Sequence, residues 1–380
     1  MKKRVLLFVY MLIILNMFTL CAKETLYLQV PSTLPSTSIK TSFGEELVKL
    51  IDNAQYEISF AIYGLRGQDE ILKALMDAQE RGVSVKGVVD SDSHDKNYYS
   101  DTYALYKYFE IVSDHKSYIM HNKFFVIDKS IVWSGSSNIS DTGTGGYNAN
   151  NCLVMSDVNI ANIYLKEFNQ MFYEKKFHNK KEVVTYEDIQ TEDSLVSIYF
   201  SPKSNTYETA LKKLIQNAHQ YIYIPVFYLT HKDLAQQLIQ AKNRGVEIKI
   251  ILDATAARNK YSMHRELRKN GIEVKVENFG GKMHIKSIIV DDKYIVSGSM
   301  NLTKAGNSKN DENTIVVQNT NIAKQYKSYF LKLWESIPEK YLYRDPSAES
   351  LESKNSCSDG IDNDFDHKID IKDYTCIKIQ

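Results

Sequence analysis

An internal repeat is the feature that most constrains how this chain folds. The stretch MHNKFFVIDKSIVWSGSSN (120–138) returns as MHIKSIIVDDKYIVSGSMN (283–301), with its polar residues at an offset of 163. RGVSVKGVVD (81–90) returns as RGVEIKIILD (244–253) at the same offset. About 130 residues of each half follow this plan with few insertions. A period of this length is too long for a solenoid and predicts a duplicated domain.

Both halves predict the same order of elements. Apolar spacing indicates helix, strand, helix, strand in each half: Glu45–Asn53, Tyr56–Tyr63, Asp69–Arg81 and Val83–Asp90, then Tyr207–His219, Tyr221–Tyr228, Lys232–Arg244 and Val246–Asp253. An amphipathic helix closes each half (159–172 and 321–334). Strands that alternate with helices predict an α/β fold. We expect a first lobe, a charged linker without apolar period and a second lobe, at 23–178, 179–194 and 195–345.

The N-terminus has the composition of a targeting segment. Basic residues at positions 2–4 precede an apolar run that reaches about Ala22. This pattern predicts that 1–22 is an export signal, with a retained membrane anchor as the alternative. Cys21 resembles a lipoprotein cleavage site, although Leu20 is larger than such sites prefer. We expect an exported protein that is periplasmic, secreted, or held at the cell envelope by a lipid or membrane anchor.

The overall charge of the chain does not favour binding to a polyanion such as nucleic acid. Lys+Arg and Asp+Glu both total 47. Coating of nucleic acid rests on neutralisation of phosphates by an excess of basic residues, so this balance counts against that class. A local basic cleft stays open as an alternative.

The last segment, 351–380, differs in character from the repeat. Its acids fall at positions 1, 3, 5, 9 and 12 of a calcium-loop spacing: Asp362, Asp364, Asp366, Asp370 and Asp373. His367 occupies the position at which such loops have Gly, and the last acidic residue is Asp rather than Glu. Cys357 and Cys376 bracket the segment and can pair in an oxidising compartment. We expect a small calcium-binding loop, with a solvated acidic tail as the alternative.

The repeated motif places polar side chains in apolar strands. Residues i and i+2 share a face of a strand, so His121 projects with Lys123, and His284 with Lys286. A single histidine in such a strand is ordinarily structural. Two copies that face each other would surround one spot with two histidines, two lysines, two asparagines and two serines, which suits a phosphodiester. The lysines supply positive charge, so no metal is required for catalysis, and zinc is disfavoured because each motif offers one ligand.

At these residues the chain resembles the phospholipase D superfamily, whose motif is His-x-Lys-x4-Asp-x6-Gly-Ser-x-Asn. The resemblance extends from about Leu47 to Trp334. It implies an α/β fold of two homologous lobes, each a mixed β-sheet flanked by helices, packed as a pseudo-two-fold monomer. It also implies one active site between the lobes and a covalent phosphohistidine.

The same resemblance implies roles for the motif residues. His121 is expected to be the nucleophile and His284 the general acid and base. Lysines and asparagines would bind phosphate and serines would assist: Lys123, Lys286, Asn138, Asn301, Ser136 and Ser299. Asp128 and Asp291 belong to the catalytic motif, although we expect them to hold loops and tune local charge. Glu312 fits an acid that orients a histidine, whereas the first half has Asn150 at that place, so the two histidines are expected to differ.

Several functions share this chemistry. The first expectation is a phospholipase D-like hydrolase that acts on a phospholipid membrane surface. An exported or membrane-anchored endonuclease of the same superfamily and a cardiolipin synthase-type phosphatidyltransferase are the alternatives, with a non-enzymatic binding role last. Nucleic acid is therefore the alternative substrate, and no obligate protein partner is implied. No cofactor is expected for catalysis, and calcium is expected only as a structural ion in the tail.

Overall fold

The computed structural model describes residues 23–95, 99–114 and 118–377. The predicted export signal, 1–22, lies outside the described residues. Within the described ranges, no helix is long and apolar enough to span a membrane.

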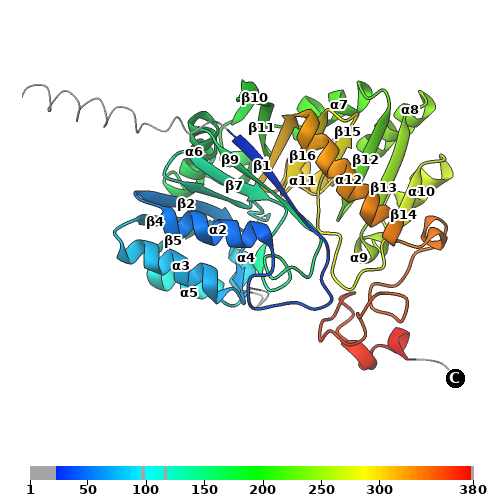
Figure 1. Ribbon diagram of the computed structural model, residues 1–380, viewed down its shortest axis with the longest axis horizontal. Helices are drawn as coiled ribbons and strands as arrows, with labels where there is room; N and C mark the ends of the chain where they lie inside the picture. The colour runs from blue at the N-terminus through cyan, green and yellow to red at the C-terminus, as the bar shows by residue number, and fades with distance from the viewer. Residues whose placement is uncertain (1–22, 96–98, 115–117, 378–380) are drawn as a thin grey trace, which may run out of the picture.

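The first lobe is built on a seven-stranded mixed sheet (Figure 1). The strands run in the order β1-β9-β7-β6-β2-β4-β5. Their bounds are β1 Lys23–Gln29, β2 Glu57–Ile62, β4 Ser84–Val89, β5 Glu110–Ser113, β6 Phe124–Ile127, β7 Ile131–Gly135 and β9 Asn150–Ser156. The strands β2, β4 and β5 pair in parallel, and β6, β7 and β9 are antiparallel.

The second lobe repeats this sheet and adds one edge strand. Its order is β10-β11-β17-β16-β15-β12-β13-β14. The bounds are β10 Thr185–Gln190, β11 Leu195–Ser201, β12 Tyr221–Val226, β13 Glu247–Leu252, β14 Glu273–Val276, β15 Ile288–Val290, β16 Tyr294–Gly298 and β17 Glu312–Gln318. From β11 to β14 the order matches that from β1 to β5, so the two-lobed fold that the repeat predicted is confirmed.

The segment expected to be a linker is part of the second lobe. Residues 179–194 contain β10, which pairs antiparallel with β11. Lys181 is 1% exposed and forms ion pairs with Glu167 and Asp311. The sequence suggested a linker because this segment lies outside the repeat and is rich in charge, but a buried ion-pair network and an edge strand hold it in place.

Helices cover both faces of each sheet. In the first lobe α2 (Ser42–Asn53) and α3 (Asp69–Glu80) lie on one face, and α6 (Val158–Phe172) lies on the other. In the second lobe α7 (Lys212–Gln216), extended by the single turn η2 (Tyr207–Leu211), and α8 (Lys232–Asn243) take the first role, and α12 (Thr320–Ser336) the second. Apolar residues at helical spacing explain the packing; in α2 the buried positions include Phe43, Leu47 and Ile51.

One continuous core joins the lobes. It contains buried residues of α6 and α12 together with strand residues from both sheets. Tyr164 on α6 shows the continuity, because its ring lies 5.1 Å from that of Phe124 in the first lobe and 5.2 Å from that of Phe200 in the second. A shared core fixes the relative position of the two motif segments, which a flexible hinge would not do.

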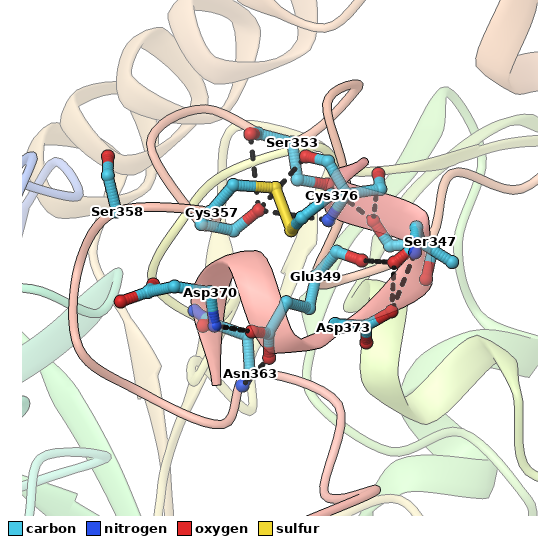
Figure 2. The surroundings of a disulfide bond; sticks show 12 residues. Ser347, Glu349, Ser353, Cys357, Ser358, Asn363, Asp370, Asp373 and Cys376 are labelled. Atoms are coloured by element: carbon cyan, nitrogen blue, oxygen red, sulfur yellow. Dashed lines mark hydrogen bonds between the residues drawn. A yellow bond between two sulfur atoms is a disulfide. The ribbon is translucent and has the colours of Figure 1, made fainter. Parts of the chain in front are cut away.

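Short elements complete the described chain. They are β3 Leu65–Arg66, β8 Ile139–Ser140, α4 Ser91–Asp95, α5 Thr102–Tyr108, η1 His178–Lys180, α9 Ala254–Ala257, α10 His264–Lys269, α11 Lys304–Ser308, η3 Glu339–Leu342, η4 Asp370–Lys372 and η5 Tyr374–Cys376. The tail after η3 lies near α9 in Figure 1, and a disulfide joins Cys357 to Cys376 (Figure 2). The pairing that the bracketing cysteines suggested is therefore present, and Cys152 is a buried free thiol in the core.

Candidate active site

The two motif histidines sit on segments that the opposite lobe holds. The backbone N–H of His121 donates to the carbonyl of Asp311 at 2.8 Å, and that of His284 donates to the carbonyl of Ala149 at 3.0 Å. Isolated β-bridges accompany these bonds, Met120 with Asp311 and Ala149 with Met283. The histidine segment of each lobe is thus fixed by backbone hydrogen bonds to the other lobe.

The side chains that orient the histidines also cross between lobes. Nδ1 of His121 lies 2.7 Å from Oε2 of Glu312, the first residue of β17. Nδ1 of His284 lies 3.2 Å from Oδ1 of Asn150, the first residue of β9. When Nδ1 carries the proton and donates it to these oxygens, Nε2 of each ring keeps a lone pair for chemistry. The two histidines therefore differ by a full negative charge at Nδ1.

The motif serines support the orienting residues. Oγ of Ser299 donates to Oε2 of Glu312 at 2.6 Å, and Oγ of Ser136 donates to Oδ1 of Asn150 at 2.9 Å. Both serines are fully buried. The sequence suggested that they assist at the phosphate, but their hydroxyl protons are committed to the carboxylate and the amide, so they act behind the histidines.

The motif lysines are buried beside the histidines. Lys123 is 1% exposed and Lys286 is 2% exposed. The ammonium of each donates one hydrogen bond to the carbonyl of the histidine two residues before it, at 2.9 Å and 2.5 Å. An ammonium has three donors, so each retains capacity for a bound oxyanion. Asn138 and Asn301 lie half-buried, each with a buried side-chain oxygen that has no hydrogen-bond partner in the described residues.

The electrostatics of this cluster favour an anionic ligand. Burial, opposed by the Glu312 charge, lowers the pKa of His121. Burial, followed by the charges of Lys286 and Lys123, lowers the pKa of His284 well below its usual range. Burial also lowers the pKa of Lys123 to about 7 and that of Lys286 well below its ordinary value. An anion bound among these groups would favour their charged forms and raise all four pKa values.

The motif aspartates lie away from this cluster. Asp128 follows the far end of β6 and accepts backbone N–H bonds from Gln55, Tyr56 and Glu57 at 2.7–3.0 Å. Asp291 does the same after β15, with His219, Gln220 and Tyr221 as donors at 2.7–2.9 Å. They fix the entry of the chain into β2 and β12 and do not reach the histidines. Their assignment to the catalytic residues is therefore corrected: these aspartates hold loops.

The structure brings in two acids that motif reasoning missed. Asp90 accepts the backbone N–H of Met120 at 2.8 Å, and Asp253 accepts that of Met283 at 3.1 Å. Both are buried, and each directly follows a strand, β4 or β13. The repeat carried the signal, because RGVSVKGVVD and RGVEIKIILD end in these residues. They hold the backbone immediately before each histidine.

The motif glycines permit close strand contact. A Cβ on Gly135 would lie 2.1 Å from the carbonyl oxygen of Asn151, and one on Gly298 would lie 2.2 Å from that of Asn313. Gly298 also has φ of +137°, in the region that favours glycine. The missing side chains let β7 pack closely against β9, which begins with Asn150. They likewise let β16 pack closely against β17, which begins with Glu312.

A cavity of about 900 Å³ opens beside His284. Aromatic side chains from both lobes line it, namely Tyr63, Tyr99, Tyr147, Phe227 and Tyr228. The tail lines it too, through residues that include Ile361, Asn363 and Phe365. The charged residues Arg66 and Asp141 on its wall form an ion pair at 2.5 Å. No pattern in the sequence indicated that the tail would reach this cavity.

The acids of the expected calcium loop form two groups that share Asp364. Asp364 lies with Asp366 and Asp373 in one and with Asp362 and Glu349 in the other, each group with one oxygen per residue within 4.8 Å of the others. Asp370 belongs to neither, because its carboxylate accepts the backbone N–H groups of Asp359 and Gly360. The spacing thus misassigned Asp370, and it missed Glu349, which precedes the cysteine-bracketed segment.

Comparisons with known proteins agree with this geometry. The model of the family described as cardiolipin synthase, PLD-like domain matches twice, at residues 47–172 and 211–334. A phospholipase D from Rickettsia bellii is 34% identical over 146 residues, which cover 38% of this chain and 72% of the relative. A mitochondrial cardiolipin hydrolase from Chlamydomonas reinhardtii is 30% identical over 112 residues, which cover 30% of this chain and 50% of the relative.

A solved structure matches the two lobes together. The phosphatidylserine synthase of Haemophilus influenzae aligns with 84% of this chain and 92% of its own, with a TM-score of 0.61 and 14% identity. At this identity the likeness supports the fold and carries no statement about activity.

Proposed function

Because the chain belongs to the phospholipase D superfamily and is a phospholipase D-like phosphodiesterase, we propose that it hydrolyses the head-group phosphodiester of phospholipids through a phosphohistidine on His121. The observation that carries this assignment is the carboxylate of Glu312 at Nδ1 of His121, where His284 has only an amide. A carboxylate stabilises the positive charge that an imidazole ring gains when Nε2 attacks phosphorus.

In the first step Nε2 of His121 forms a bond to phosphorus while the bond from phosphorus to the head-group oxygen breaks. His284 donates its Nε2 proton to that oxygen, and the head-group alcohol leaves. The acid must hold a proton at this moment, although burial and the neighbouring lysines lower the pKa of His284 in the free site. The phosphate anion of the substrate would raise the pKa of His284, so substrate binding would favour the protonated form that acts as the acid.

In the second step neutral His284 takes a proton from water, and the water oxygen bonds to phosphorus as the bond from phosphorus to His121 breaks. Phosphatidate leaves and both histidines return to their starting states. Lys123 and Lys286, with the side chains of Asn138 and Asn301, would hold the non-bridging oxygens throughout. Because the lysines supply the positive charge, we expect catalysis to need no metal.

The cavity supports lipid over nucleic acid as the substrate. Several aromatic side chains line its wall, and two basic side chains there are engaged: Arg66 pairs with Asp141, and Lys282 donates to Thr255 and to the carbonyl of Asn363. A groove for single-stranded nucleic acid combines stacked aromatics with basic residues along the backbone path, and here the basic residues Arg66 and Lys282 already bind groups of the protein itself. The names of the relatives, phospholipase D and cardiolipin hydrolase, point the same way. A membrane surface would then be the site of action, and the basic-apolar N-terminus supports export to the cell envelope.

The test compares substrates in the presence of EDTA. Purified protein would be given phosphatidylcholine vesicles, cardiolipin vesicles or single-stranded DNA, with His121→Ala and His284→Ala as matched variants. We expect the lipids to be hydrolysed and the DNA to stay intact. With labelled lipid, the wild-type protein should carry an acid-labile label, and His121→Ala should not. Cleavage of DNA without lipid turnover would make the protein a nuclease, and transfer of the phosphatidyl group to an added alcohol in preference to water would make it a transferase.

A further inference from the structure

The tail from Glu349 to Cys376 contains a group of acidic side chains; Figure 2 shows one of them, Asp373, in the segment that the disulfide closes. One carboxylate oxygen each from Asp364, Asp366 and Asp373 lies within 4.8 Å of the others. Two oxygens on opposite sides of a calcium ion are separated by about 5 Å, since each Ca–O distance is about 2.4 Å. The three oxygens are therefore close enough to share one such ion.

A buried, unpartnered oxygen points to a ligand at this group. Asp373 is 1% exposed. Its Oδ1 accepts hydrogen bonds from the backbone and hydroxyl of Thr375, but its Oδ2 is buried and has no hydrogen-bond partner in the described residues. A buried carboxylate oxygen without a partner is costly, and a cation would remove that cost.

Protein cations neutralise only part of the group. Arg258 pairs with Asp364, whose side chain is 4% exposed, and Lys368 lies 3.5 Å from Asp366. Within the described residues no ion pair is found for Asp373, nor for Asp362 and Glu349, which form the neighbouring acidic group with Asp364. A hard divalent cation with carboxylate ligands fits this excess of negative charge.

We propose that the tail binds a calcium ion through Asp364, Asp366 and Asp373, next to Asp362 and Glu349, and that this ion holds the wall of the catalytic cavity. The ion is structural and takes no part in the reaction at the histidines. The binding site itself does not depend on which phosphodiester the enzyme cleaves.

The contacts of Asn363 connect this site to the cavity. Its backbone N–H donates to Glu349 at 2.8 Å, and its side-chain amide donates to the carbonyl of Gly280 at 2.8 Å and to the hydroxyl of Tyr147 at 3.2 Å. Tyr147 belongs to the first lobe and Gly280 to the second. Asn363, which directly precedes the proposed ligand Asp364, thus bridges both lobes at the cavity.

Lys282 completes the connection to the catalytic segment. Its ammonium donates to the carbonyl of Asn363 at 2.9 Å and lies 4.3 Å from the ring centre of Phe365. Lys282 stands two residues before His284 in the chain. An ion that orders residues 362–366 would therefore also restrain the segment that carries the second histidine.

The first experiment measures calcium binding directly. The full protein, stripped with EDTA, would be titrated with CaCl2 by calorimetry, alongside Asp366→Asn and Asp373→Asn. We expect one ion per chain for the wild type and a loss of affinity of about tenfold or more in both variants, because ligand charge sets affinity. Asp77→Asn, an equal charge change on the exposed face of α3, should bind like the wild type. No heat at millimolar calcium, or unchanged binding in both tail variants, overturns the site.

The second experiment measures the connection to the cavity without relying on activity. Amide hydrogen exchange would be followed by peptide mass with and without calcium. We expect slower exchange at 359–366 and at 280–284 in the wild type, and no calcium effect in Asp366→Asn, whose side chain is partly exposed and whose tail should still fold. Resistance of Cys357 and Cys376 to alkylation without reductant checks that folding. Calcium binding without slower exchange at 280–284 contradicts the restraint of the catalytic segment.

Discussion

The carboxylate of Glu312, in the second lobe, lies 2.7 Å from Nδ1 of His121 in the first lobe. The reciprocal contact, between Asn150 and His284, is an amide contact at 3.2 Å. Each histidine is therefore incomplete without the other lobe, and only one of them has a charged partner. This asymmetry supports the proposal that His121 is the nucleophile.

Replacement of Glu312 by Gln should slow formation of the phosphohistidine. The amide keeps the shape but loses the charge that stabilises the imidazolium, so kcat should fall by about 10²-fold or more. Single-turnover kinetics with labelled substrate measure this step. Equal slowing of intermediate formation and breakdown would contradict the role of Glu312 as the partner of the nucleophile.

Asn150→Asp is the matched change on the other histidine. A carboxylate at Nδ1 should raise the pKa of His284, which the buried site holds well below its usual value. The limb of the pH profile of kcat/KM that reports this group should move to higher pH. A profile identical to that of the wild type would show that this position does not act on His284.

Asp128→Ala and Asp291→Ala should destabilise the protein without changing the chemistry of the folded enzyme. Each loses an acceptor for three backbone N–H groups, which should lower the free energy of unfolding by about 1–3 kcal/mol. Urea unfolding measures this loss, with Asp52→Ala on the exposed face of α2 as the control. A large fall in kcat of the folded variants would return these residues to the active site.

Gly298→Ala should displace β17 and with it Glu312. The added methyl would lie 2.2 Å from the carbonyl oxygen of Asn313, so we expect a loss of about 2 kcal/mol or more together with reduced kcat. Gly245→Ala is the control, because Gly245 also has positive φ (+92°) but no atom within 4 Å of the added methyl. Similar losses in both variants would mean that backbone strain, rather than collision, dominates.

The His178 network should make stability fall at alkaline pH. Burial alone would lower the pKa of His178, but Asp114 and Asp311 raise it from 6.5 to about 9. Its charged form therefore stabilises the fold fully below pH 6.5, and that contribution disappears as the pH rises through about 9. Urea midpoints at pH 6.5, 8 and 9.5 should decline for the wild type, and less steeply for His178→Gln.

The exposed His219 supplies the control for this prediction, since His219→Gln should leave the pH dependence of the urea midpoint unchanged. Parallel curves for the wild type and His178→Gln would remove His178 as the source of the alkaline loss.

The sequence predicted much of the fold because the information was periodic. The strand expected at Val246–Asp253 is β13, Glu247–Leu252, and the helix expected at Lys232–Arg244 is α8, Lys232–Asn243. The sequence did not predict the edge strand β10, because this strand has no counterpart in the first half and its charged residues obscure the alternation of apolar and polar positions.

The site was less accessible to sequence reasoning. Spacing pointed to both histidines and to Glu312. It does not show which histidine the Glu312 carboxylate contacts, because each orienting residue contacts the histidine of the opposite lobe. The same limit applies to Ser136 and Ser299, whose hydroxyls point to the orienting side chains rather than to the phosphate position. The place of the tail depends on long-range contacts such as that of Asn363 with Gly280, which no local pattern contains.

The exchange of orienting residues also bears on how such an enzyme can diverge. In a dimer of identical chains the positions of Glu312 and Asn150 would be encoded by a single codon, so both histidines would receive the same partner. Fusion of two copies in one chain removes that constraint, because each copy can then mutate alone. A dimer of identical chains could not hold an amide at one position and a carboxylate at the other, and in the proposed mechanism this difference would let one histidine specialise in attack and the other in proton transfer.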